Sequence, residues 1–391
     1  MIFLEENTSY IVITLPYREG GVSAIVRNIL NFINHKELFF QVILVKNLRD
    51  KNDEKPDNFD TDITTVFEYS SLENKYFVFK RFCKIIPKNA LIITNDYFEL
   101  QALNTIKRKN KTIHIIHSSG EYNFENVKKY QGIIDTIVSV SKYIKNKAIE
   151  TVGKEKIKHE YISQPVPNNN VTRKINKEKT LNIVFVGRIT EEKGIFDLPQ
   201  IDSLLKQKNI GVNWTIVGFG KDKNQLQKTW NNKNVIWKGK LTNKEVYEIY
   251  LKNDIVILPS HAEGFPVVII EAMKIGLVPL VSDLPSGIPE IIKNGVNGFT
   301  FPVNAPNKYA DVIEKIDVDR NLLEKLKENA IKSTNDNFNP AVQADKYRKV
   351  INSLLNAKEK EKNYIKDKQG FMDKPFIPNF IVFLFRKIRK K

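Results

Sequence analysis

Residues 259–273 read Pro-Ser-His-Ala-Glu-Gly-Phe-Pro-Val-Val-Ile-Ile-Glu-Ala-Met, and this stretch says most about the fold of the chain. It follows a short apolar run at 255–258 that is typical of a buried strand, and it leads into an apolar pattern with helical periodicity. A Gly/Pro loop joins the two. Because the first N–H groups of a helix have no partner inside the helix, a strand, a tight loop and a helix start form a ready site for an anion. The stretch therefore predicts an α/β unit with a ligand site where this strand ends.

Two carboxylates stand in this stretch, Glu263 in the loop and Glu271 eight residues later. Eight residues of α-helix rise about 12 Å, roughly the distance from the sugar to the ribose of a sugar nucleotide. We therefore expect the two carboxylates to bind both ends of such a molecule. In a chain with 45 acidic residues the bare pair is a weak signal. Its alternative is a solvated loop glutamate and an ordinary glutamate near a helix start, where it favours the helix dipole.

A second apolar run, at 181–186, ends in the segment Gly187-Arg188-Ile189-Thr190-Glu191-Glu192-Lys193-Gly194. Glycine at the end of a strand lets the backbone approach a ligand closely. Arg188 supplies a planar fork that suits phosphate oxygens, and Lys193 supplies a point charge. The segment therefore predicts a phosphate site, and its alternative is a basic turn at the surface of a lysine-rich protein.

Both segments resemble signatures of the retaining glycosyltransferases of family 4. Residues 259–273 resemble the E-x7-E signature, and residues 187–194 resemble the G-R-x-x-x-x-K-G element that holds the diphosphate of the sugar donor. The loop with Gly20 and Gly21 resembles the family's N-terminal glycine loop, whose N–H groups face the donor phosphate. The resemblance covers roughly residues 10–355. It implies an α/β protein of the GT-B fold, in which two Rossmann-like parallel-sheet domains face a central cleft.

The resemblance also implies a role for each matched residue. Glu271 accepts hydrogen bonds from ribose hydroxyls, and Glu263, with N–H groups of residues 264–267, holds hydroxyls of the transferred sugar. Arg188 and Lys193 stabilise the charge that grows on the leaving diphosphate, so that no metal or other cofactor is required. The predicted catalytic residues are Glu263, Arg188, Lys193 and His117, and the predicted donor-binding residues are Gly20, Gly21, Gly187, Gly264, Phe265, Pro266, Val267 and Glu271.

Two residues of the first half are candidates with plain alternatives. His117 ends an apolar run at 112–116 and matches a family histidine that approaches the transferred sugar, but a histidine there can also simply cap the end of a strand. Asp96 follows another apolar run and is the candidate that faces the acceptor. Many aspartates at such positions only cap the next helix.

Length and pattern predict two domains. With 391 residues the chain is long for one core, and strand-like and helical patterns alternate in both halves. We expect an acceptor-binding domain at 1–165, a linker at 166–180, a nucleotide-sugar-binding domain at 181–338, a crossover helix at 339–358 that returns to the first domain, and a tail at 359–391.

The tail is the other informative feature. The chain has 62 Lys and Arg against 45 Asp and Glu, a net charge of +17, and residues 358–391 hold eleven basic and four acidic residues. An apolar run at 376–385 is too short to span a bilayer, but with the basic end that follows it suits an anionic membrane surface. Its alternative is a helix packed on the first domain. No nucleic-acid-binding motif accompanies the charge, and the single Cys83 suits a reducing compartment. We expect a cytoplasmic protein, peripheral at the inner face of the cytoplasmic membrane.

These features predict a retaining enzyme that moves a hexose-type sugar from a UDP- or GDP-sugar to a glycan or lipid-linked acceptor, in the biosynthesis of a bacterial surface polysaccharide such as capsule or lipopolysaccharide. Three alternatives remain open. A metal-dependent transferase would use an Asp-x-Asp motif, as at 60–62 or 317–319. A non-hydrolysing epimerase shares the fold but is not expected to carry Glu263-Gly264-Phe265-Pro266. A non-catalytic subunit would bind sugar donor or lipid beside a partner.

Overall fold

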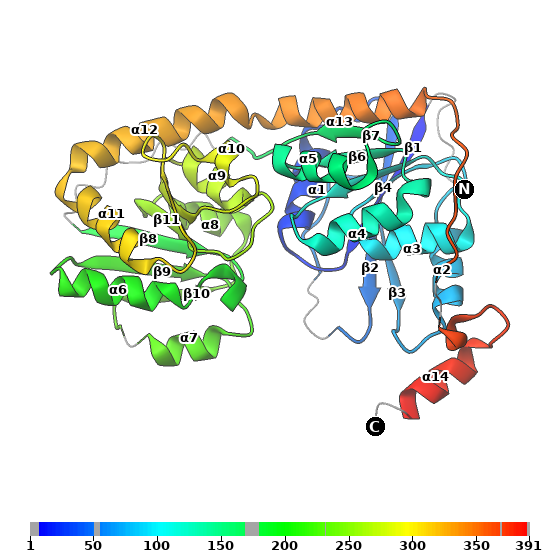
Figure 1. Ribbon diagram of the computed structural model, residues 1–391, viewed down its shortest axis with the longest axis horizontal. Coiled ribbons are helices and arrows are strands. Elements are labelled where there is room, and N and C mark those ends of the chain that lie inside the picture. Colours follow the sequence, from blue (N-terminus) through cyan, green and yellow to red (C-terminus); the bar gives the residue numbers. More distant parts are fainter. Residues whose placement is uncertain (1–7, 51–54, 169–179, 231, 368–369, 389–391) are drawn as a thin grey trace. The chain divides into compact units, whose positions relative to one another are not determined.

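The computed structural model describes residues 8–50, 55–168, 180–230, 232–367 and 370–388 (Figure 1). The chain divides into two compact units, one of residues 1–165 together with 340–391 and one of residues 166–339. The predicted linker at 166–180 lies mostly outside the described residues. Each unit is built around a parallel sheet of its own.

The first unit contains a seven-stranded sheet in the order β3-β2-β1-β4-β5-β6-β7, with every neighbouring pair parallel. Its strands are β1 (Ser9–Pro16), β2 (Leu38–Asn47), β3 (Ile63–Tyr69), β4 (Leu91–Thr94), β5 (Thr112–Ile116), β6 (Thr136–Ser139) and β7 (Lys158–Tyr161). Its helices are α1 (Gly21–Phe32), α2 (Lys75–Lys84), α3 (Tyr97–Ile106), α4 (Glu121–Tyr130), η1 (Gln131–Ile133), α5 (Lys142–Val152), α13 (Pro340–Leu355), η3 (Phe371–Asp373) and α14 (Asn379–Ile388).

The second unit contains a six-stranded parallel sheet in the order β10-β9-β8-β11-β12-β13. Its strands are β8 (Leu181–Val186), β9 (Val212–Val217), β10 (Val235–Gly239), β11 (Ile255–Leu258), β12 (Val278–Ser282) and β13 (Phe299–Phe301). Its helices are η2 (Glu191–Lys193), α6 (Asp197–Gln207), α7 (Lys223–Thr229), α8 (Asn243–Tyr250), α9 (Val267–Lys274), α10 (Ile288–Ile291), α11 (Pro306–Val318) and α12 (Arg320–Asn337).

The central strands of both sheets are mostly apolar, because they are covered on both faces. Every residue of β4 and of β11 is buried, as expected for short strands of a parallel sheet. Strand order reverses once in each sheet, between β1 and β4 in the first unit and between β8 and β11 in the second. Ligands of open α/β sheets bind beyond the carboxyl ends of the strands at such a reversal. The two reversals therefore mark where each unit's site is to be sought.

The C-terminal segment belongs to the first unit. Helix α13 packs against α1, so the predicted return of the terminal helix to the first domain is confirmed. Beyond α13 the tail runs along the same unit to α2 (Figure 1). Lys362 forms an ion pair with Asp135, and the Tyr130 hydroxyl donates to Asp367 at 2.9 Å. No helix of the described residues is long and apolar enough to cross a bilayer.

Candidate active site

The reversal in the second sheet brings the two sequence signatures together. Strands β8 and β11 are neighbours, with Ile183 opposite Ile255 and Val184 opposite Val256. The loop after β8 carries the Gly-Arg signature, and the loop after β11 carries the Glu-Gly-Phe-Pro signature. Because the strands are parallel, both loops leave the same edge of the sheet.

Three contacts join the two loops into one structure. Lys193 Nζ lies 2.7 Å from Glu263 Oε1, and the His261 N–H donates to the Glu192 carbonyl at 2.8 Å. Gly194 has a φ of 64°, and a Cβ at this position would lie 1.8 Å from the Pro259 carbonyl oxygen. The loops therefore pack so closely that only glycine fits at their crossing.

The ion pair between Lys193 and Glu263 is mostly removed from solvent, with 15% and 9% of the side chains exposed. Ser260 Oγ donates a second hydrogen bond to Glu263 Oε1 at 2.7 Å. An ammonium group carries three hydrogens, so Lys193 can hold Glu263 and still donate to a bound anion. The pair places one positive and one negative group side by side, which suits a ligand with a diphosphate next to sugar hydroxyls.

Arg188 lies at the rim of this site. Its side chain is 62% exposed and contacts Glu192 at 3.7 Å, a geometry too long for a strong hydrogen bond. The guanidinium group can therefore turn toward a phosphate at little cost. The preceding Gly187 is crossed by Gly218, whose φ is 136° and whose Cβ would lie 1.9 Å from the Gly187 carbonyl oxygen. The requirement for glycine at 218 was not predicted, because it arises from packing between loops.

The helix after β11 begins beyond the predicted Gly/Pro loop. Helix α9 begins at Val267, with Pro266 preceding it, so that only Glu271 of the two carboxylates lies on the helix. The expectation that eight residues of helix separate Glu263 from Glu271 is wrong. The reason is the loop at 264–266, which is held by the Gly287 N–H donating to the Gly264 carbonyl at 2.7 Å.

Phe265 and Val267, two predicted donor-binding residues, are buried side chains. The Phe265 ring packs edge-on against Phe338 at 5.7 Å, and a Cβ at Gly287 would lie 2.1 Å from the same ring. Side chains so placed fix the loop and the start of α9. Any contact that these two residues make with a sugar donor therefore comes from the backbone.

Glu271 carries the most perturbed carboxylate of the unit. Burial raises the pKa of Glu271 to about 7, and the charge of Lys274 offsets part of this rise. The same burial lowers the pKa of Lys274 to about 8. The hydroxyl of Tyr247 on α8 is buried and has no hydrogen-bond partner among the described residues. This burial, with a smaller contribution from the charge of Glu271, raises the pKa of Tyr247. A carboxylate and an open hydroxyl group suit the hydroxyls of a bound ribose.

Lys274 is a structural residue that the sequence did not reveal. Its ammonium donates to the Val166 carbonyl at 2.6 Å, to Asn168 Oδ1 at 2.6 Å and to the Phe338 carbonyl at 2.9 Å. These partners stand at the beginning and at the end of the second unit. Helix α9 is thereby fastened to both ends of the unit, one turn after Glu271.

The reversal in the first sheet carries the candidates of the first unit. Gly20 and Gly21 open α1 after β1, and the Ser23 hydroxyl accepts from the Gly20 N–H at 2.9 Å. No heavy atom of the described residues lies within 4 Å of a Cβ built at Gly20 or Gly21. Packing does not demand glycine at these two positions, and a ligand can approach their backbone closely.

His117 stands where β5 ends, next to the end of β4. Its Nε2 lies 2.7 Å from Asn95 Oδ1, while Asn95 Nδ2 donates to the Thr14 carbonyl at 2.8 Å. The amide oxygen of Asn95 therefore faces His117, which must donate from Nε2. Burial, with a smaller contribution from His114, lowers the pKa of His117 to about 3. The ring is neutral, and its buried Nδ1 is an acceptor without a partner among the described residues.

Asp96 caps helix α3. Its carboxylate accepts from the Tyr97 N–H at 2.7 Å, and Glu99 returns the bond by accepting from the Asp96 N–H at 2.9 Å. Asp96 therefore has the alternative role of a helix cap, and its role toward the acceptor stays a prediction.

The Asp-x-Asp alternatives are also occupied. Asp62 accepts from the Phe40 N–H, Asp317 pairs with Arg320, and Asp319 caps α12. Within the described ranges, no group of three or more His, Cys, Asp or Glu residues is arranged to hold a metal ion.

Comparison with known proteins identifies the second unit. Residues 168–333 match the family described as Glycosyl transferases group 1. The uncharacterized glycosyltransferase MJ1069 of Methanocaldococcus jannaschii is 28% identical over 281 residues, covering 64% of this chain and 70% of that protein. The capsular polysaccharide biosynthesis glycosyltransferase CapM of Staphylococcus aureus is 26% identical over 199 residues, covering 49% and 52%. The structure of Anabaena Alr3699/HepE in complex with UDP and glucose has a TM-score of 0.72 at 15% identity, covering 88% of this chain and 100% of that one.

The second unit therefore carries the domain of the group 1 glycosyl transferases. The likeness to HepE shows the fold, and the predicted α/β class of the GT-B kind, with two Rossmann-like units, is confirmed. Membership of family 4 stays a prediction. The chain spans about half the length of two of the first curated relatives that it matches, 51% and 52%.

Proposed function

We propose that the protein is a retaining glycosyltransferase that moves a hexose-type sugar from a UDP- or GDP-sugar to a glycan or lipid-linked acceptor. The observation that carries the proposal is the pair of signature loops at the sheet reversal, joined by Lys193 and Glu263 at 2.7 Å. A site of this kind offers charge for a diphosphate and acceptors for sugar hydroxyls within one ligand length.

In the proposed reaction the bond between the anomeric carbon and the diphosphate oxygen of the donor breaks. A new bond forms from the same carbon to the acceptor hydroxyl oxygen, and the hydroxyl proton passes to the leaving diphosphate on the same face of the sugar. Arg188 and Lys193 stabilise the charge that develops on the diphosphate, which is electrostatic catalysis by preorganised groups. No metal ion or other cofactor takes part in the proposed step.

We propose that different residues bind different parts of the sugar donor. Glu263 and the N–H groups of the loop at 264–267 hold hydroxyls of the transferred sugar, and Glu271 accepts from the ribose. Tyr247 adds a hydroxyl group that has no partner among the described residues. His117 is proposed to accept a sugar hydroxyl at Nδ1, because its Nε2 proton is engaged by Asn95 at 2.7 Å.

The biological setting is proposed by analogy. CapM is named for capsular polysaccharide biosynthesis, and a comparable role in a bacterial surface polysaccharide suits a lipid-linked acceptor. We propose a location at the inner face of the cytoplasmic membrane, supported by the net charge of +17 and by the basic tail.

A thermal-shift panel with UDP, GDP, UDP-glucose, GDP-mannose and NAD⁺, run in EDTA, tests the site. A ligand that binds the folded state raises the melting temperature by mass action. We expect one nucleotide class to stabilise the wild type and to lose its effect in Glu271→Ala, while Asp345→Ala, a substitution in α13 of the first unit, behaves like the wild type. If no nucleotide shifts the wild type, the proposed donor site is wrong and the non-catalytic subunit becomes the better explanation.

A further inference from the structure

Helix α14 is fastened to the first unit by one of its faces. Asn379, Val382 and Arg386 follow one another at intervals of three and four residues, so they lie on the same side of the helix. Val382 is fully buried, while the two polar residues bond to the start of α2. The helix is therefore seated with a defined rotation about its own axis.

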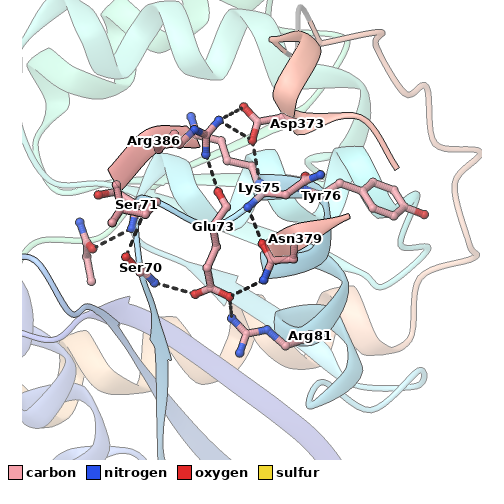
Figure 2. A network of polar contacts seen from close by, with 12 residues as sticks. Ser70, Ser71, Glu73, Lys75, Tyr76, Arg81, Asp373, Asn379 and Arg386 are labelled. Carbon is pink, nitrogen blue, oxygen red and sulfur yellow. Dashed lines mark hydrogen bonds and ion pairs between the residues drawn. The ribbon is translucent and has the colours of Figure 1, made fainter. Parts of the chain in front are cut away.

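The polar part of this attachment centres on Arg386 (Figure 2). Its Nη2 lies 2.9 Å from both carboxylate oxygens of Asp373, and its Nη1 donates to the Glu73 carbonyl. Asp373 also accepts from the Lys75 N–H at 2.8 Å. Ion pairs that are partly removed from water and share hydrogen bonds with the backbone hold a fixed geometry.

A second set of bonds fixes the chain just before α14. The Asn74 N–H donates to Asn379 Oδ1 at 2.7 Å, and Asn74 Nδ2 donates to the carbonyls of Lys374 and Ile377 at 2.9 and 2.8 Å. The Asn74 side chain is fully buried and also caps α2 by accepting from the Tyr76 N–H. The seat of α14 is thus built from buried groups that lie about three hundred residues away in the sequence.

The opposite side of α14 is apolar and exposed. Phe380, Leu384 and Ile388 recur every fourth residue, with 67%, 56% and 73% of each residue exposed. Ile381 and Phe385 lie beside them and are exposed as well. Soluble proteins rarely leave a contiguous apolar strip of this kind in water unless it meets a partner.

Positive charge accompanies this face. From residue 374 to the end, the sequence contains six basic residues and no acidic one. Lys387 is exposed on the described part of the helix, and Arg389, Lys390 and Lys391 follow in the sequence. An apolar strip bordered by basic residues is the pattern of helices that lie in the interface of an anionic membrane. A second copy of the chain would bring an equally basic segment to this face, with no acidic residue from 374 onward to offset the charge.

We propose that the exposed face of α14 (Phe380, Ile381, Leu384, Phe385 and Ile388) is the surface on which the protein docks on an anionic lipid bilayer. The face lies in the interface with its phenylalanine and leucine side chains among the upper acyl chains, and the basic residues contact lipid phosphates. The polar seat around Arg386 then fixes the angle at which the first unit meets the membrane. This inference rests on the proposed membrane location and names the surface that provides it.

Co-sedimentation of the full chain with vesicles tests the surface. One set of vesicles contains phosphatidylglycerol and phosphatidylethanolamine in equal parts, and the other contains phosphatidylcholine alone. The test variant is Phe380→Ser/Leu384→Ser, and the control is Leu48→Ser/Val342→Ser, two exposed apolar residues of the same unit. All four positions are exposed, and we expect every variant to keep the wild-type melting temperature.

We expect the wild type to bind the anionic vesicles, less strongly in high salt, and to bind phosphatidylcholine weakly. The partition coefficient should fall on the order of 100-fold in the test variant, about five-fold in Lys387→Ser, and remain unchanged in the control. Equal binding of test variant and wild type would overturn the assignment. Dimerisation of the wild type through this face would also overturn the assignment. It would be recognised by a dimeric wild type and a monomeric test variant. Stabilisation by a sugar nucleotide in the test variant separates this result from a failure of the proposed donor site.

Discussion

Replacing Glu271 by glutamine separates two effects of its carboxylate, which are its contribution to ligand affinity and its effect on the stability of the folded protein. Glutamine keeps the size of the side chain and its acceptor oxygen but cannot carry charge. The pKa of Glu271 is about 7 in the folded protein, against an ordinary value of 4.5, because the half-buried carboxyl group loses contact with water. At neutral pH the site therefore contains carboxylate and carboxylic acid in comparable amounts.

The raised pKa means that the folded protein holds the proton of Glu271 more tightly than the unfolded chain does. The contribution of Glu271 to stability is then fully present below the unfolded pKa of 4.5 and is lost as the pH rises through 7. The difference between the two pKa values corresponds to about 3 kcal/mol. Above neutrality we expect Glu271→Gln to raise the free energy of unfolding by up to this amount, less what Lys274 loses when the neighbouring charge is removed.

Binding of the sugar nucleotide should have the opposite pH dependence. If ribose hydroxyls donate to the carboxylate, only the ionised form binds well. Between about pH 8 and about pH 6 the ionised share falls from about nine tenths to about one tenth, so the Kd of the wild type should rise about tenfold. In Glu271→Gln the Kd should be weaker at the higher pH and nearly independent of pH.

Isothermal titration with UDP-glucose and GDP-mannose measures this effect, since their diphosphates have no ionisation near neutrality. Urea unfolding of the ligand-free proteins at the same pH values measures the stability term. The reasoning is refuted if the glutamine variant keeps the pH dependence of the wild type. It is also refuted if the variant is less stable than the wild type above neutrality.

Three further substitutions test the architecture of the second unit. Gly194→Ala should lower the free energy of unfolding by about 3 kcal/mol or more, because its φ is 64° and its Cβ would strike the Pro259 carbonyl oxygen; urea unfolding measures this, and an unchanged midpoint would contradict it. Lys193→Met should lower sugar transfer about 100-fold in a product assay while the protein remains folded, and turnover like that of the wild type would exclude Lys193 from catalysis. Lys274→Met should cost about 3 kcal/mol in thermal unfolding, since two buried carbonyl oxygens and the Asn168 amide oxygen lose their donor, whereas a raised melting temperature would show that the buried charge is itself the larger cost.

Sequence patterns predicted the features of the second unit that depend on local rules. The apolar runs at 181–186 and 255–258 form β8 and β11 with the same bounds, because buried parallel strands are mostly apolar. The closeness of Lys193 to Glu263 follows from parallel strands whose loops leave one edge of the sheet. The helical rise assumed between Glu263 and Glu271 was wrong, because Glu263 lies in the loop before α9.

The features that sequence could not predict share one physical cause, which is that their partners lie far away along the chain. Lys274 reads as an ordinary surface lysine in a helix, yet it is buried and bonds to both ends of its unit. The sequence around Asn74 is typical of a helix cap, and Asn74 does cap α2. Its amide also bonds to the segment before α14, about three hundred residues away in the sequence. The periodicity of a short segment carries no information about contacts with residues far away in the sequence.

Glu271 and the exposed face of α14 both depart from the usual pattern of folded proteins, in which charged groups remain in water and apolar groups are buried. Desolvation raises the pKa of the Glu271 carboxylate to about 7, and an apolar helix face is more than half exposed at Phe380, Leu384 and Ile388; both features lower the stability of the isolated chain. Proteins tolerate such features where a ligand or a partner relieves the penalty. For Glu271 the proposed relief is a ribose hydroxyl, and for α14 it is a lipid interface. Glu271→Gln should accordingly gain stability while it loses binding of the sugar nucleotide. Phe380→Ser/Leu384→Ser should keep its stability while it loses binding to the membrane. Substitutions at purely structural positions do not produce this combination.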